Sequence, residues 1–106
     1  MIIVRTEMQC KWGRVAEALQ NAKELYQRVS GELSAIKRIR ILTDMSGRHD
    51  TVVIEAEIES MDAYFAMLDA IFASPEFQAM QAERMAADQP YESGARNFYK
   101  VEAVFE

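Results

Sequence analysis

The chain begins with a stretch in which apolar and polar side chains alternate. In residues 2–10 the even positions, such as Val4 and Met8, are mostly apolar, whereas the odd positions include Arg5. A period of two is typical of a strand with one buried face. The apolar spacing then becomes helical over residues 15–29. We therefore expect a strand followed by an amphipathic helix.

Two further alternating stretches, residues 35–44 and 51–59, flank a turn-rich segment and predict a β-hairpin. Placing Asp44 opposite Thr51 gathers opposite charges on one face of this hairpin. A slip of one residue would mix apolar and charged side chains on both faces. The predicted register pairs Leu42 with Val53, Arg40 with Glu55 and Arg38 with Glu57, and it places Ile39, Ile41, Val52, Ile54, Ala56 and Ile58 on the apolar face.

The second half of the chain predicts another helical region and a last strand. Ser60 is expected to cap the helix, and Ser74 followed by Pro75 provides a second cap at which the helix bends or breaks. Alternation returns over residues 95–105. The order is βαββαβ, which with right-handed crossovers predicts an α+β, ferredoxin-like fold with a four-stranded antiparallel sheet and its helices on one face.

The alternation also assigns the faces of this sheet. The even positions of the first and third strands and the odd positions of the second and fourth are expected to meet the helices. The other face combines large apolar side chains with nearly balanced charges, which favours a homodimer packed sheet on sheet over a monomer with an exposed sheet. That face is expected to carry Ile3, Arg5, Glu7, Ile36, Arg38, Arg40, Leu42, Val53, Glu55, Glu57, Arg96, Phe98, Lys100, Glu102 and Val104.

Composition narrows the class of protein. The 106 residues are 50% hydrophobic and carry a formal net charge of -5, which fits one domain over residues 1–106 with a small core. The excess of acidic over basic residues argues against nucleic acid as a partner. No apolar run is long enough to span a membrane. A single cysteine and no targeting segment predict a cytoplasmic protein.

Three segments carry a family resemblance: residues 46–53 (SGRHDTVV), 57–64 and 72–77 (FASPEF). With the element order, they resemble the NIPSNAP-type branch of the dimeric α+β barrel superfamily, which also holds the antibiotic-biosynthesis monooxygenases. The resemblance covers nearly the whole chain and implies a homodimeric barrel of two facing sheets, with a small-molecule pocket between each sheet and its helices. It implies no particular reaction. Haem-degrading members are expected to place a proximal histidine on the second helix, and residues 61–87 contain none.

Isolated reactive side chains have simpler structural explanations. His49 is the only histidine, and a solvated turn residue is favoured over an acid, base or ligand. Glu7, Glu55 and Glu57 fit ion pairing with nearby arginines better than a cation site, so no metal is expected. Cys10 fits a small core side chain better than a nucleophile.

The remaining candidate is a set of aromatic and amide side chains expected to point between the sheet and the helices. In residue type they are similar to those with which cofactor-free oxygenases of the superfamily hold a polycyclic substrate and assist its deprotonation. Tyr99 or Tyr64 would orient a phenolic or enolisable substrate and Asn97 would stabilise an oxyanion. In the alternative they are core aromatics with satisfied polar ends. The set comprises Trp12, expected to close the pocket mouth, with Tyr26, Tyr64, Phe65, Asn97 and Tyr99.

Two functions therefore follow from the sequence. The first is a homodimer, without a cofactor, that binds a small apolar or aromatic molecule, with cofactor-independent monooxygenase activity as its candidate chemistry. The second is a non-catalytic interaction module that acts through its dimer face. The sequence does not decide whether the protein is an enzyme. Met61, Met67, Met80 and Met85 fit either an adaptable pocket or an irregular core.

Overall fold

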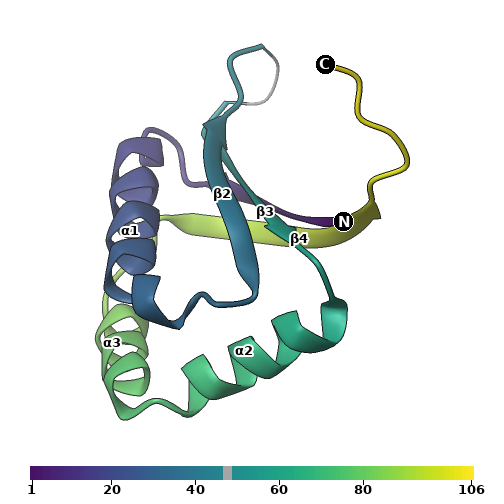
Figure 1. Cartoon of the computed structure of the whole chain (residues 1–106). Coiled ribbons are helices and arrows are strands. Elements are labelled where there is room, and N and C mark those ends of the chain that lie inside the picture. The colour runs from purple at the N-terminus through teal and green to yellow at the C-terminus, as the bar shows by residue number, and fades with distance from the viewer. Residues whose placement is uncertain (47–48) are drawn as a thin grey trace.

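Four strands form one antiparallel sheet in the order β2-β3-β1-β4. The computed structural model describes residues 1–46 and 49–106. Figure 1 shows the helices on one side of the sheet and the C-terminal residues extending away from them. The α+β, ferredoxin-like arrangement expected from the sequence is confirmed. The elements are β1 (Ile2–Cys10), α1 (Val15–Arg28), a 3-10 turn (Ser30–Glu32), β2 (Ile36–Thr43), β3 (Thr51–Ile58), α2 (Met61–Ala73), α3 (Pro75–Ala86) and β4 (Tyr91–Lys100).

The second helical region is divided in two by the residues that the sequence suggested. The Ser60 hydroxyl accepts a hydrogen bond from the amide of Ala63 at 3.2 Å and caps α2. Ser74 has an extended backbone and caps α3 through the amide of Phe77 at 3.4 Å, with Pro75 at the start of the helix. Within the described residues, no helix is long and apolar enough to cross a membrane.

The register of the β2–β3 hairpin is confirmed. Arg40 lies opposite Glu55 and Arg38 opposite Glu57, and both pairs form ion pairs, at 2.6 and 3.1 Å. The amide of Asp44 donates to the carbonyl of Thr51 at 3.3 Å, which closes the ladder where the sequence placed its end. Charge pairing across the strands therefore fixes the same register as the apolar pattern.

A β-bulge at the start of β2 corrects one expected position. Ile36 pairs with Ile58 and Arg38 pairs with Glu57, so Lys37 is the extra residue of the bulge. Because the bulge reverses the alternation on its N-terminal side, Ile36 turns to the helix-facing side and packs against the core. The sequence pattern had placed Ile36 on the opposite face.

The faces of β4 are the reverse of those expected. Phe98 lies opposite Val4, which is only 2% exposed in the core, and Arg96 lies opposite Thr6. Residues directly opposite each other in a ladder share a face, so Phe98 and Arg96 face the helices. Lys100 lies opposite Ile2 on the same side.

The expected strand also lay too far along the chain, which explains the reversal. It covered residues 95–105, whereas β4 begins four residues earlier, at Tyr91, and ends five residues earlier, at Lys100. β4 ends at Lys100, and residues 101–106 lie outside the sheet. Val101 is held through its amide, which donates to the carbonyl of Met1 at 3.0 Å, whereas Phe105 is 94% exposed. The expected faces of β4 depended on apolar residues that in fact lie beyond the end of the strand. Glu102 and Val104 are likewise not residues of the sheet.

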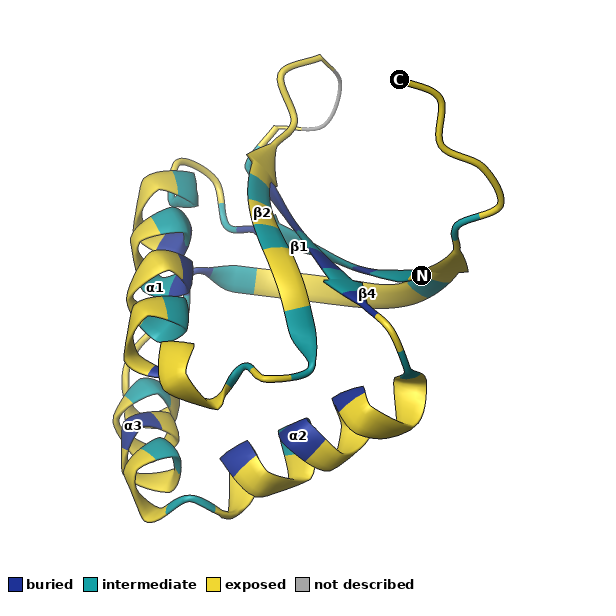
Figure 2. Cartoon of the chain, viewed as in Figure 1, coloured by how far each residue is buried: buried dark blue, intermediate teal, exposed yellow. Residues whose placement is uncertain are grey.

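The core consists of two clusters on the helix-facing side of the sheet, and Figure 2 shows the buried positions on the inner sides of the helices. One cluster lies beneath α2 and the other beneath α1. Cys10 is 1% exposed within the second, as expected for a core side chain. The α2 cluster contains Val4, Ala56, Ile58, Tyr64, Met67 and Ile71, and the α1 cluster contains Cys10, Ala18, Ala22, Val52 and Ile54.

We use the name outer face for the side of the sheet turned away from the helices. It carries the charged ladder of the hairpin together with apolar and aromatic side chains. Among these, Leu42 is 37% exposed and Tyr99 is 50% exposed. The outer face comprises Ile3, Arg5, Glu7, Arg38, Arg40, Leu42, Val53, Glu55, Glu57, Asn97 and Tyr99.

Candidate functional site

A cavity of about 130 Å³ lies between the helices and the inner face of the sheet. Aliphatic and thioether side chains such as Leu25, Met67 and Ile71 form most of its wall. Ile36 reaches the cavity because the bulge turns it inward. An apolar cavity of roughly 150 Å³ accepts benzene, so this one has room for a single aromatic ring or a short aliphatic chain.

Three polar side chains from three elements also line the cavity: Tyr26 from α1, Tyr64 from α2 and Arg96 from β4. Burial raises the pKa of Tyr26, and the neighbouring Tyr64 acts in the same direction, whereas the positive charge of Arg96 opposes both. The three groups are therefore within electrostatic reach of one another. The sequence identified the two tyrosines but placed Arg96 on the outer face.

Two further aromatic rings pack against Tyr64 without lining the cavity. The ring of Phe98 lies edge-on to Tyr64, with centroids 6.0 Å apart, and 5.7 Å from the ring of Phe65. Phe65 in turn lies 5.7 Å from Tyr64 and is 45% exposed. Tyr26 and Tyr64 thus line the cavity as expected, whereas Phe65 lies beside it, and Phe98 joins Phe65 because the even positions of β4 face the helices.

Asn97 and Tyr99 do not belong to this cavity. They lie opposite Arg5 and Ile3 on the outer face. Their predicted orientation toward the helices is wrong, because the odd positions of β4 were expected to face the helices and instead lie on the outer face. An oxyanion in the cavity cannot be reached by Asn97 from the other side of the sheet.

Trp12 also lies away from the cavity. It is 84% exposed in the connection between β1 and α1, and its ring meets that of His49 edge-on, with centroids 6.1 Å apart. The expectation that Trp12 closes the mouth of the pocket is therefore wrong. His49 is an exposed residue of the β2–β3 turn, as expected, and its carbonyl accepts a hydrogen bond from Gln9 at 2.8 Å.

Ion pairing accounts for Glu55 and Glu57 on the outer face, whereas Glu7, which was expected to pair with an arginine as well, forms no ion pair within the described residues. Glu55 accepts hydrogen bonds from Arg5 at 3.0 Å and from Arg40 at 2.6 Å. Glu57 is bound by Arg38. Within residues 1–46 and 49–106, no group of three or more histidine, cysteine, aspartate and glutamate residues is arranged to hold a metal ion.

A second ionic cluster joins the end of α3 to the start of α1. Asp88 binds Lys11 at 2.7 Å and Arg14 at 2.8 Å, and Arg14 also binds Glu17 at 2.9 Å. The hydrogen bond from Lys11, together with both positive charges, lowers the pKa of Asp88. The sequence gives no sign of this cluster, because its partners are far apart in the chain.

Cys10 lacks the environment of a reactive thiol. Burial raises its pKa, and the negative charges of Asp50 and Glu92 act in the same direction. The thiolate is therefore disfavoured at neutral pH, which agrees with the interpretation of Cys10 as a core side chain.

The fold and the cavity together define an α+β protein of the ferredoxin-like type with a small apolar pocket between sheet and helices. No protein-family model matches the chain, and no curated protein matches it. Solved structures do match. An uncharacterized NIPSNAP domain protein from Burkholderia xenovorans is 25% identical with a TM-score of 0.71, and the match covers 99% of this chain and 97% of that one.

Two other solved structures connect the fold with known chemistry. An antibiotic biosynthesis monooxygenase is 16% identical with a TM-score of 0.66, covering 97% of this chain and 100% of that one. The heme degrader MhuD from Mycobacterium tuberculosis, with two hemes bound in its active site, is 13% identical with a TM-score of 0.75 over 100% of both chains. These likenesses confirm the resemblance to NIPSNAP-type and monooxygenase-like proteins of the dimeric α+β barrel superfamily, at the level of the fold.

The residues of this chain do not fit a haem. The single histidine, His49, is in an exposed turn beside Trp12 and does not line the cavity. A volume of about 130 Å³ also has no room for a macrocycle. The pocket is suited to a much smaller molecule.

Proposed function

We propose that the protein is a homodimer that binds one small apolar or aromatic molecule in the cavity between sheet and helices. The observation that carries this proposal is the cavity itself, which combines apolar walls with the convergent polar groups of Tyr26, Tyr64 and Arg96. Such a combination is typical of small-molecule sites. The monooxygenase and the heme degrader of similar fold support it as proteins whose names imply small-molecule substrates.

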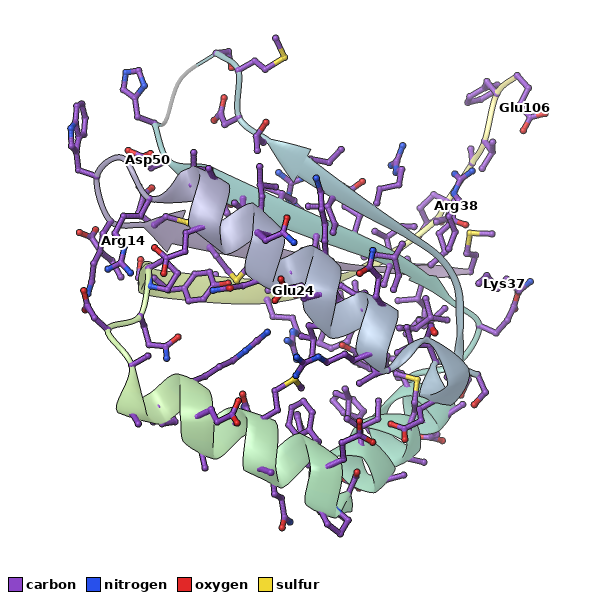
Figure 3. The ribbon with its side chains drawn as sticks, turned by 90° about the vertical axis from the view of Figure 1, so that its left-hand side faces the viewer. Arg14, Glu24, Lys37, Arg38, Asp50 and Glu106 are labelled. Atoms are coloured by element: carbon purple, nitrogen blue, oxygen red, sulfur yellow. The ribbon has the colours of Figure 1, made fainter. Side chains whose placement is uncertain are left out.

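The outer face supports the homodimer. Large side chains such as Leu42 and Tyr99 lie beside ion-paired charges, a mixture typical of partly wet protein interfaces. Residues 101–106 extend beyond the sheet with Val104 and Phe105 exposed, and Figure 3 labels Glu106 at the tip of this segment. A second copy packed on the outer face would cover apolar surface that one chain leaves in water.

Cofactor-independent monooxygenase activity is the chemistry proposed for this pocket. Tyr64 would orient a phenolic or enolisable substrate, and the positive charge of Arg96 would favour its deprotonated form. Asn97 and Tyr99 have no part in this arrangement, since they lie on the outer face. Oxygen uptake with a panel of single-ring quinols tests the reaction, and Tyr64→Phe is expected to reduce it.

A cavity-filling variant tests binding directly. The probe is 4-methylphenol, whose single ring suits the volume of about 130 Å³ and which is expected to raise the melting temperature of the wild-type protein. Met67→Trp would fill the cavity and abolish this shift, because Met67 is 7% exposed in its wall. Met85→Trp is the matched control, since Met85 is 80% exposed on α3 and lies outside the cavity. No shift in the wild-type protein, or an equal shift in both variants, would contradict the proposal.

The alternative function is a non-catalytic module that acts through its outer face alone. The exposed Leu42 and Tyr99 are the observation in its favour. If this alternative holds, filling the cavity leaves the association of the chains unchanged. The wild-type protein then binds none of the probes. The 4-methylphenol experiment therefore separates the two functions.

A further inference from the structure

Arg96 differs from the arginines on the other side of the sheet. Arg38 and Arg40 each bind a carboxylate within 3.1 Å. Arg96 faces the helices and forms no ion pair with any residue in the described part of the chain. It is also the one charged side chain among the described residues that line the cavity. The cavity thus has a cation and no carboxylate.

One hydrogen bond holds the guanidinium of Arg96 and leaves most of its donors free. Its Nε donates to the hydroxyl of Thr6 at 3.1 Å, on the neighbouring strand directly opposite Arg96. A guanidinium has five N–H donors in a planar fork, which suits the two oxygens of a carboxylate. The contact with Thr6 therefore limits the rotation of the fork while its terminal nitrogens remain available.

The two tyrosine hydroxyls extend this donor set. Tyr26 and Tyr64 line the same cavity, and neither hydroxyl has a hydrogen-bond partner among the described residues. Each hydroxyl can donate to an anion. The remaining wall is aliphatic or aromatic, so the complement of this cavity is a molecule with one anionic end and one apolar body.

We propose that the pocket selects a small apolar carboxylic acid in its ionised form, with the carboxylate on Arg96 and the ring or chain between α1 and α2. The inference rests on the proposed binding function and adds the charge of the ligand to it. A carboxylate is favoured because the fork of Arg96 binds it bidentately. The volume of about 130 Å³ limits the apolar body to one ring or a short chain.

Matched acid and amide probes test the proposal by titration calorimetry at pH 7. Phenylacetate and phenylacetamide have nearly the same shape, and hexanoate and hexanamide form a second such pair. We expect the wild-type protein to bind each acid at least tenfold more tightly than its amide. Arg96→Gln is expected to remove this preference by weakening the acids alone, and Arg96→Lys to retain part of it. Lys23→Gln is the control, because Lys23 is exposed on α1 and does not line the cavity.

The outcomes separate this inference from the proposed function. Equal binding of acids and amides by the wild-type protein overturns the charge selection and leaves the apolar pocket supported. An acid preference that survives in Arg96→Gln also overturns it, since another group would then bind the anion. The comparison of acid with amide in the wild-type protein does not depend on whether a variant folds. If the wild-type protein binds neither probe of either pair, nor 4-methylphenol, both the inference and the proposed function are wrong.

Discussion

Replacing Glu55 with glutamine tests whether a second copy covers the outer face. Glu55 accepts hydrogen bonds from both Arg5 and Arg40, at 3.0 and 2.6 Å, and its side chain is only 15% exposed. The two arginine side chains are 38% and 56% exposed in the single chain. The variant keeps the shape of the side chain but leaves two cations without their counter-charge.

The size of the effect depends on whether water reaches these cations. In a free chain the exposed pairs contribute about 0–1 kcal/mol each, so Glu55→Gln would change stability by at most about 2 kcal/mol. Beneath a second copy, the loss of one partner of a buried pair costs about 3–5 kcal/mol. The dissociation constant reflects the difference between these two costs, at least about 1 kcal/mol for each chain of a symmetric dimer and so about 2 kcal/mol in all. Since every 1.4 kcal/mol is about a factor of ten, the constant would rise by a factor of about 25 or more.

Sedimentation equilibrium over a wide range of protein concentrations measures this constant. The matched control is Glu17→Gln, which removes the partner of Arg14 on α1, away from the outer face. We expect the control to associate as the wild-type protein does. A wild-type protein that sediments at its monomer mass of 12.1 kDa at micromolar concentration would refute the reasoning. A Glu55→Gln dimer of unchanged affinity would do the same.

Three shorter predictions concern the core, pH and fluorescence. Ile58→Ala should lower the free energy of unfolding by about 2–5 kcal/mol in urea titrations, because Ile58 is fully buried; a loss below about 1 kcal/mol would contradict the packing described. The folded-state pKa of Asp88 is lowered, so its contribution to stability is present above the ordinary aspartate pKa of 3.8 and is lost as the pH falls through the folded-state value. Thermal melts of Asp88→Asn should therefore show a shallower decline on the acid side, and an identical pH profile would count against the cluster with Lys11 and Arg14. Trp12, the single tryptophan, should be freely quenched by acrylamide with and without a pocket ligand, and protection by the ligand would place it at the cavity after all.

Local patterns in the sequence were sufficient to predict most of the fold. The hairpin register could be predicted because the charges of Arg40 and Glu55 and the apolar side chains of Ile41 and Ile54 each require the same pairing. The break between α2 and α3 could be predicted because Ser74 provides a local cap. In each case the deciding residues are neighbours in sequence or in one hairpin.

The sequence could not predict which residues of β4 face the helices, and this decided which residues were expected in the site. Phe98 and Tyr99 are adjacent aromatic residues, so either could face the core, and the choice depends on pairing with β1 at the other end of the chain. This error moved Asn97 and Tyr99 into the pocket and took Arg96 out of it. A one-residue difference in parity therefore replaced a neutral amide by a cation as the polar group that faces the ligand.

The two core clusters differ in how much of the pocket wall they provide. The cavity runs along the cluster beneath α2, whereas Ala18 and Ala22 join α1 to the sheet through the other cluster. Substitutions at Met67 or Ile71 would reshape the pocket while α1 stays packed on the sheet. The same scaffold can therefore acquire new ligands through changes in one helix, and a designer who wishes to alter its specificity should begin with α2.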